Sequence, residues 1–122
     1  MIFKSGGTIT MAKVFITLTG TKHYFGNEFL EKGMKIRLEK ETDNDYDREA
    51  IMVTYGGLGK IGYVANSSYT VIGECISAGR LYDKIGDIAY AKVVLITSLG
   101  TICKVCKKSL KNEKKIKILN EE

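Results

Sequence analysis

An acidic loop that contains an aromatic residue is the part of the sequence best equipped for chemistry. Between Asp43 and Asp47 the chain places three aspartates, Asn44 and Tyr46 in five consecutive positions. Asn and Asp are common in turns because their side chains bond the local backbone, so we expect Asp43 and Asp45 to cap the turn. A tyrosine beside a carboxylate, on a loop between strands, is typical of a small recognition site.

A second loop, residues 20–26, carries a cation and three rings between glycines: Lys22, His23, Tyr24 and Phe25. We expect one of Tyr24 and Phe25 to point into the core. In a small curled barrel both loops can reach one rim. Together they would offer a cation for a phosphate, rings for bases, and a carboxylate with an amide for a sugar hydroxyl.

The carboxylate of Asp47 restricts the kind of nucleic acid that fits such a site. At close range it would repel the phosphates that surround an internal nucleotide. A free 3′-hydroxyl is a donor, and a carboxylate is purely an acceptor. Provided that the two loops meet, the sequence favours capture of a strand end over a continuous binding track.

Other interpretations of these residues stay open at this point. Asp43, Asp45 and Asp47 could hold magnesium or manganese in a nuclease or another hydrolase, although the chain shows neither a second acidic cluster nor an obvious general base. An aromatic groove could instead bind a peptide. The Tyr46 ring could simply fold onto the barrel rim, and Asp47 could serve a salt bridge or hydrogen bond within its loop.

The cysteines give a weaker signal. Cys103 and Cys106 form one C-x-x-C motif, which Cys75 and His23 would have to complete for a zinc site, and these positions lie far apart in the sequence. We therefore expect free thiols, no bound metal and no cofactor. An odd number of cysteines, without a signal peptide or an apolar run of membrane-spanning length, predicts a cytoplasmic protein that does not associate with membranes.

Strand patterns must position both loops, and they predict a mainly β fold: a small OB-like β-barrel of about six strands with one or two helices. Alternation places Ile36 and Leu38 towards the core. The second to fourth strands should form an antiparallel meander with the acidic loop at one end, and 93–96 should be buried. A helix is predicted from an N-cap at Asn66–Ser68 to Gly79, with a further turn over 80–85. The expected strands are 14–19, 35–41, 50–55, 60–64, 88–97 and 101–105.

Length and charge indicate one domain with a basic end. The 122 residues carry a net charge of +5, and seven lysines against three glutamates after residue 102 account for most of it. We expect a leader at 1–12, a domain at 13–102 and a Lys-rich tail at 103–122. Met11 is an alternative start to Met1. The tail is suited to weak contact with phosphates.

Three blocks of the sequence resemble the HIRAN domain family, in its stand-alone bacterial form. They are Gly20–Gly26, Asp43–Ile51 and Gly59–Val64, and the resemblance covers about residues 14–97. It implies an OB-like barrel without enzymatic activity. In eukaryotes such domains are fused to fork-remodelling helicases, and the DNA-binding example captures the 3′ end of single-stranded DNA. The resemblance therefore implies a role in DNA repair or replication-fork processing, with a helicase or nuclease as a possible partner.

Site residues follow from this resemblance position by position. Tyr46 matches a ring that stacks on terminal bases, Asp47 matches the acid that receives the 3′-hydroxyl, and Asn44 matches a polar residue of the same loop. Lys22 stands where the DNA-binding member has an arginine, and it keeps the charge but not the bidentate fork. His23 replaces a stacking tyrosine and is followed by Tyr24, and Asp45 replaces a usual proline. The implied DNA-binding set is Lys22, His23, Tyr24, Asn44, Tyr46 and Asp47.

Overall fold

Six strands, one short α-helix and three 3₁₀ turns make up the part of the chain that the structure describes. The structure is a computed structural model, and it describes residues 13–111. The predicted leader and most of the predicted tail lie outside these residues. The strands are β1 (Phe15–Thr19), β2 (Lys35–Lys40), β3 (Ile51–Tyr55), β4 (Gly59–Val64), β5 (Ile88–Ile96) and β6 (Thr101–Val105), the helix is α1 (Ala78–Tyr82), and the 3₁₀ turns are η2 (Thr21–His23), η3 (Gly56–Leu58) and η4 (Lys107–Ser109).

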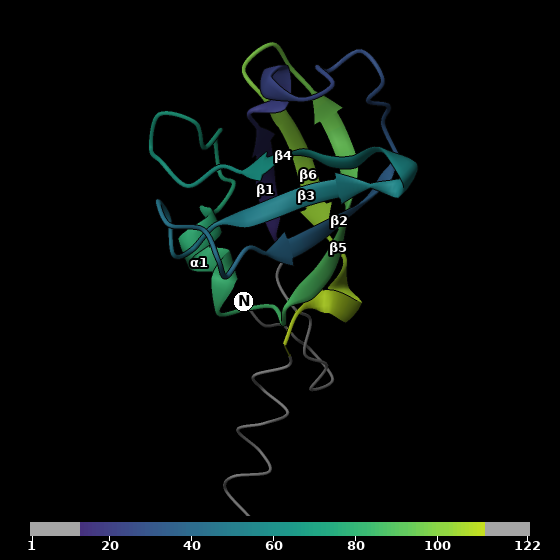
Figure 1. The fold of residues 1–122 in the computed structure, drawn as a ribbon. Helices are drawn as coiled ribbons and strands as arrows, with labels where there is room; N and C mark the ends of the chain where they lie inside the picture. Colours follow the sequence, from purple (N-terminus) through teal and green to yellow (C-terminus); the bar gives the residue numbers. More distant parts are fainter. Residues whose placement is uncertain (1–12, 112–122) are drawn as a thin grey trace, which may run out of the picture.

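The strands close into one antiparallel barrel, in the order β1-β4-β3-β2-β5-β6 (Figure 1). Strands β2, β3 and β4 form the predicted meander, and β1 closes the barrel by pairing with both β4 and β6. The acidic loop connects β2 to β3 and lies near α1 in Figure 1. This architecture confirms the mainly β barrel expected from the strand patterns.

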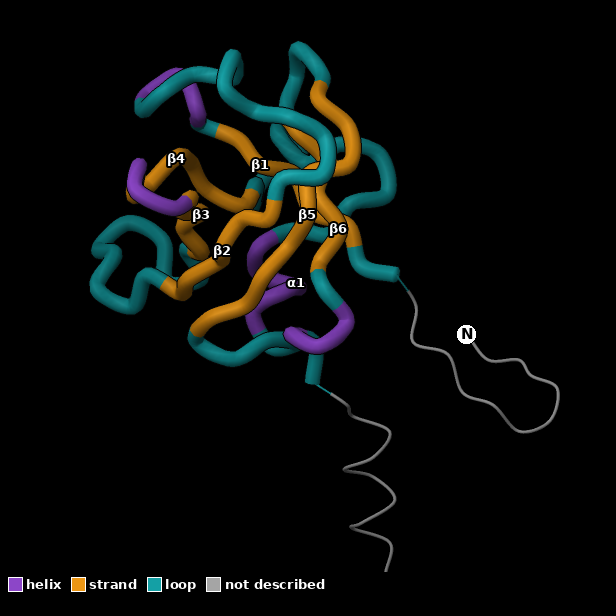
Figure 2. Tube along the Cα trace, turned by 90° about the vertical axis from the view of Figure 1, so that its right-hand side faces the viewer, coloured by secondary structure: helices purple, strands orange, loops and turns teal. Residues whose placement is uncertain are grey.

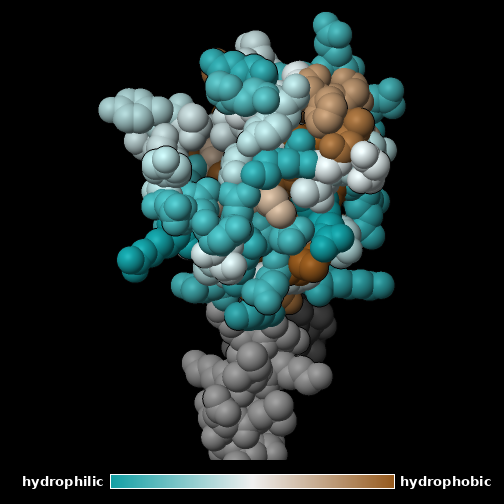
Figure 3. Space-filling model, viewed as in Figure 1, coloured by the Kyte–Doolittle hydropathy of each residue, from teal (hydrophilic) through white to brown (hydrophobic). Residues whose placement is uncertain are grey.

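The barrel interior is filled by the alternate, inward-facing residues of each strand. Ile36 and Leu38 of β2 are fully buried, as predicted, and the core continues through Ile16, Ile51 and Leu81. The outer face over β2, β3 and β4 is mostly hydrophilic, with hydrophobic side chains gathered at one upper corner (Figure 3). Polar chemistry therefore lies on the outside of the meander.

An extra residue in β4 changes which side chains face outward. Val53 pairs with Gly62, but the next residue, Thr54, pairs with Lys60, so Ile61 has no partner in β3. Such a bulge offsets the alternation of the strand by one residue. Lys60 and Tyr63 would point to opposite faces of a regular strand, but here both lie on the outer face while Ile61 is buried.

Two sequence predictions are wrong. Residues 66–77 form turns, because Gly73 has a positive φ of 54° and interrupts the expected helix; the helix occurs at α1, where a further turn was predicted. In β5, Val93 is buried but Leu95 and Ile96 are 53% and 39% exposed. The register shifts between Val93 and Leu95, so the chain after Val93 turns its side chains outward.

The sequence suggested that the domain ends at residue 102. The barrel extends further along the chain than this position. Strand β6 continues to Val105, and Leu110 is buried against the core. Among residues 13–111, no helix is long and apolar enough to cross a membrane.

Gly62 should be essential for the contact between β1 and β4. A Cβ atom at this position would lie 2.6 Å from the Thr19 carbonyl oxygen and 2.8 Å from Leu18 Cδ1. We expect Gly62→Ala to lower the free energy of unfolding by about 1–3 kcal/mol, because the backbone must move to admit the methyl group. Urea unfolding measures this loss. The control is Gly57→Ala, which meets open space and should change stability by less than about 0.5 kcal/mol; equal losses would contradict the expectation.

Candidate nucleic-acid interface

The acidic loop is organised by Asn44. Its Oδ1 accepts hydrogen bonds from the backbone N–H groups of Tyr46 and Asp47, both at 2.8 Å. Its Nδ2 donates to Glu41 Oε1 at 2.8 Å, which ties the turn to the end of β2. Asn44 and Asp47 therefore cap the turn in place of Asp43 and Asp45, which are exposed. The sequence prediction gave this role to the wrong pair, because the four Asx residues of this loop offer equivalent capping chemistry.

Asp47 is held by bonds within and beyond its loop. Its Oδ1 accepts from the Glu49 backbone N–H at 2.9 Å, and its Oδ2 accepts from Asn66 Nδ2 at 3.2 Å. Asn66 Oδ1 in turn accepts from the Gly79 backbone N–H at 2.8 Å, which connects the loop to α1. The loop hydrogen bond considered for Asp47 is therefore present.

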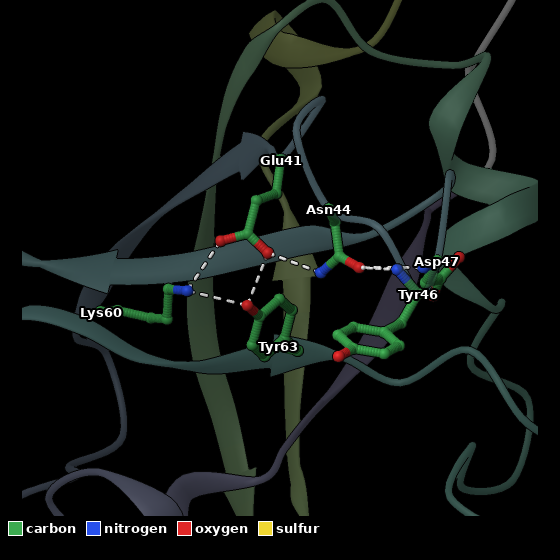
Figure 4. Close-up of polar contacts among 6 residues, drawn as sticks. All are labelled: Glu41, Asn44, Tyr46, Asp47, Lys60 and Tyr63. Atoms are coloured by element: carbon green, nitrogen blue, oxygen red, sulfur yellow. Dashed lines mark hydrogen bonds and ion pairs between the residues drawn. The ribbon is translucent and has the colours of Figure 1, made fainter.

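A cluster of Glu41, Lys60 and Tyr63 lies beside this loop (Figure 4). Lys60 Nζ is 2.7 Å from Glu41 Oε2 and 2.8 Å from the Tyr63 hydroxyl, which donates to Glu41 Oε1 at 2.5 Å. The extra residue in β4 makes this possible, since it brings both Lys60 and Tyr63 to the outer face. We call these three residues the rim cluster. Sequence analysis missed it, although the i to i+3 spacing of Lys60 and Tyr63 in a strand is a signal of a bulge.

The rim cluster shifts the pKa values of all three of its members. Partial burial raises the pKa of Glu41, but hydrogen bonds from Lys60, Tyr63 and Asn44 outweigh it and lower the pKa to about 2. The hydrogen bonds to Glu41 and Tyr63 raise the pKa of Lys60 above its ordinary value. Burial, and then the bond to Glu41, raise the pKa of Tyr63. At neutral pH the cluster is therefore a charged ion pair with a neutral phenol.

The aromatic loop approaches the rim cluster from the other side. The ring centroids of Tyr24 and Tyr63 are 6.5 Å apart, and Lys60 Nζ lies 5.9 Å from the Tyr24 centroid and 4.9 Å from that of Tyr63. Tyr24 is 41% exposed and Phe25 is 51% exposed. The prediction that one of them enters the core is wrong, because the barrel is already filled and both rings pack on its outside, with Phe25 against Phe29.

The six expected site residues lie on the two loops, with Lys22, His23 and Tyr24 on the aromatic loop and Asn44, Tyr46 and Asp47 on the acidic loop. Tyr24 and Asn44 are brought together through the rim cluster, with Tyr63 contacting one and Glu41 the other. Lys22 and His23 lie on η2, exposed at the end of β1. Tyr46 is 100% exposed, so its ring is not folded onto the barrel rim. The two loops thus share one surface, and β4 provides the link between them.

The side chains that could ligate a metal ion lie apart from one another in the described residues. Within 13–111, no three His, Cys, Asp or Glu side chains are grouped as a metal ion requires. Cys75 and Cys103 are buried free thiols, and Cys106 is partly exposed. Burial, with a smaller contribution from Cys75, raises the pKa of Cys103 to about 12, which keeps this thiol protonated and unreactive.

Comparison with known proteins identifies the family. The family model of the HIRAN domain, which describes the sequences of that family, matches residues 11–94, more than half of the chain. The chain belongs to the HIRAN family. A crystal structure of a protein from Lactobacillus plantarum shares the fold of this HIRAN domain, with a TM-score of 0.52 and 21% sequence identity over 77% of this chain and 93% of that one. A search of curated proteins finds no match. HIRAN domains are nucleic-acid-binding modules, and the surface described above is the candidate interface.

The ion pair of the rim cluster should make the free energy of unfolding of the HIRAN domain decrease at acidic pH. Because folding lowers the pKa of Glu41 from 4.5 to about 2, its contribution is complete above pH 4.5 and is lost as pH falls towards 2. We expect Glu41→Gln to lower the free energy of unfolding at pH 7 by about 1.5–3 kcal/mol. The difference from the wild type should shrink between pH 4.5 and 2, as measured by urea unfolding at each pH.

Glu28→Gln is the matched control, because Glu28 is exposed. It should change stability by less than about 0.5 kcal/mol. A Glu41→Gln deficit that stays constant down to pH 2 would contradict the assignment.

Proposed function

We propose that this HIRAN domain binds single-stranded DNA and captures its 3′-hydroxyl end. The observation that carries the proposal is the ring of Tyr46, which is fully exposed on a loop fixed by hydrogen bonds of Asn44 and Asp47. Exposing a large ring on an ordered loop leaves it without packing partners in the protein. A base is a partner of matching shape, and stacking on it is worth about 1–3 kcal/mol.

In this proposal each candidate residue has a role that its chemistry permits. Tyr46 stacks on the terminal base, and Asp47 accepts a hydrogen bond from the 3′-hydroxyl. Each Asp47 oxygen holds one protein donor and keeps capacity for another. The existing bonds would orient the carboxylate before DNA arrives.

The aromatic loop would bind the nucleotides that follow the terminal one. Tyr24 and His23 are exposed next to each other and offer further stacking surface. Lys22 would contact a phosphate as a point charge. The rim cluster, with its charges already paired, would hold the two loops at a fixed separation.

The proposal extends to a cellular setting. A domain that grips 3′ ends fits DNA repair or replication-fork processing, alongside a helicase or nuclease that acts on the same strand. The three free thiols fit a reducing compartment, and we place the protein in the cytoplasm.

Fluorescence anisotropy with short single-stranded oligonucleotides tests end capture. We expect tighter binding to a 3′-hydroxyl than to a 3′-phosphate, because Asp47 accepts a hydrogen bond from the first and repels the second. Tyr46→Ala should weaken binding about 5- to 150-fold, the equivalent of one lost stacking contact. Asp47→Asn should remove the preference between the two ends. Equal affinity of the wild type for both ends would exclude the mechanism.

Tyr69→Ala is the matched control for Tyr46→Ala, since Tyr69 is 96% exposed and lies on a different loop. It should leave affinity unchanged. Thermal unfolding of Asp47→Asn checks that the variant keeps the hydrogen bonds of this loop to Glu49 and Asn66 and does not lose affinity because the loop is disordered. Magnesium-dependent cleavage of the same oligonucleotides would instead favour the hydrolase, and binding of peptides in preference to DNA would favour an interaction domain.

A further inference from the structure

A row of three lysines crosses the barrel face next to the candidate interface. Lys35 of β2 pairs with Lys92 of β5, which pairs with Lys104 of β6. Residues directly opposite one another on paired strands share a face. The inward-facing row beside it is Ile36, Ala91 and Val105, so the lysines lie on the outside of β2, β5 and β6, the three strands that run side by side in Figure 2.

This arrangement has a cost for the folded protein. Like charges directly opposite one another destabilise a sheet, and within residues 13–111 none of the three lysines is in an ion pair. Lys35 Nζ instead lies 5.0 Å from the ring centroid of Tyr90. A polyanion laid across the row would remove the repulsion, which points to a ligand with closely spaced negative charges.

A continuous outer row connects the lysines to the candidate interface. Lys60 of the rim cluster pairs with Thr54, Thr54 with Arg37, and Arg37 with Tyr90, across β4, β3, β2 and β5. An open groove lies over the middle of this path, where its lining includes Lys35, Arg37, Thr54, Gly56 and Tyr90. With strands about 4.8 Å apart, the path from β4 to β6 is about 19 Å long.

We propose that the row of Lys35, Lys92 and Lys104, reached through this groove, binds the phosphates of a single DNA strand as it leaves the end-binding site. The inference rests on the proposed function, and it adds a second contact region of different chemistry. The row offers mainly charge, with the half-exposed ring of Tyr90 beside it and Lys35 Nζ 5.0 Å from the centroid of that ring. Contact there would be independent of base sequence and sensitive to salt.

The test compares oligothymidylates of 4 and 16 nucleotides, each with a 3′-hydroxyl, in anisotropy titrations over a range of salt. The wild type should bind the 16-mer more tightly, and the triple variant Lys35→Gln, Lys92→Gln, Lys104→Gln should lose this gain while binding the 4-mer normally. For the 16-mer, the slope of log K against log salt should become shallower by about 2, since each phosphate contact on a single strand contributes about 0.7. Should the triple variant fail to fold, Lys92→Gln alone should change the slope by about 0.7.

The control is Lys32→Gln, Arg80→Gln, Lys84→Gln, which removes the same charge outside the row. An equal change of slope in this variant would overturn the proposal, because a general loss of charge would then explain it. An unchanged slope in the triple variant of the row would also overturn the proposal. The same holds if this variant loses affinity for a blunt duplex or for polyglutamate but keeps its affinity for the 16-mer. The 3′-hydroxyl preference is the ratio of the affinities for the 3′-hydroxyl and 3′-phosphate forms of the same oligonucleotide, in which the contribution of the row cancels, so failure of end capture and failure of the row give different results.

Discussion

One unpaired residue in β4 determines the outer surface of this barrel. Without Ile61 as an extra residue, Lys60 and Tyr63 would lie on opposite faces of the strand, and a charged amine or a phenol would face the core. With it, both reach Glu41 and form a cluster whose carboxylate stays ionised down to about pH 2. That cluster joins the end of β2, the acidic loop and the aromatic loop, which are far apart in the chain. The geometry of the candidate interface therefore depends on a backbone irregularity more than on any single side chain of the loops.

The polar residues of this surface differ in what they are free to do. Glu41, Lys60 and Asn44 have their charges and hydrogen-bonding groups engaged by the protein, so they set positions. Tyr46, Tyr24, Lys22 and His23 are exposed, and their rings and charges are directed to solvent. Binding sites of high fidelity need both kinds, because preorganised groups lower the entropy lost when a ligand is ordered. The division also lets a barrel close to electrical neutrality present exposed rings and a lysine on one part of its surface.

Sequence patterns predicted the strands well, since alternation of apolar residues such as Ile36 and Leu38 follows directly from burial of one face. They failed where one residue changes the register. The bulge in β5 turns Leu95 outward, and the bulge in β4, whose sign in the sequence is the i to i+3 spacing of Lys60 and Tyr63, hid the rim cluster. The helix expected over 66–79 failed because Gly73 adopts a positive φ. The loops of the candidate interface were identified from residue type alone, but which Asx residue caps the turn depends on backbone geometry.

Closure of the barrel has a consequence for the way any partner is recognised. Each of the six strands pairs with a neighbour on both sides, although β1 and β4 share only two residue pairs, Leu18 with Val64 and Thr19 with Tyr63. Closure therefore leaves little free edge for strand addition, the mode of peptide binding that reads a backbone and tolerates many side chains. Selectivity in this domain must come from side chains and loop tips, whose identities can change while the barrel beneath them stays the same.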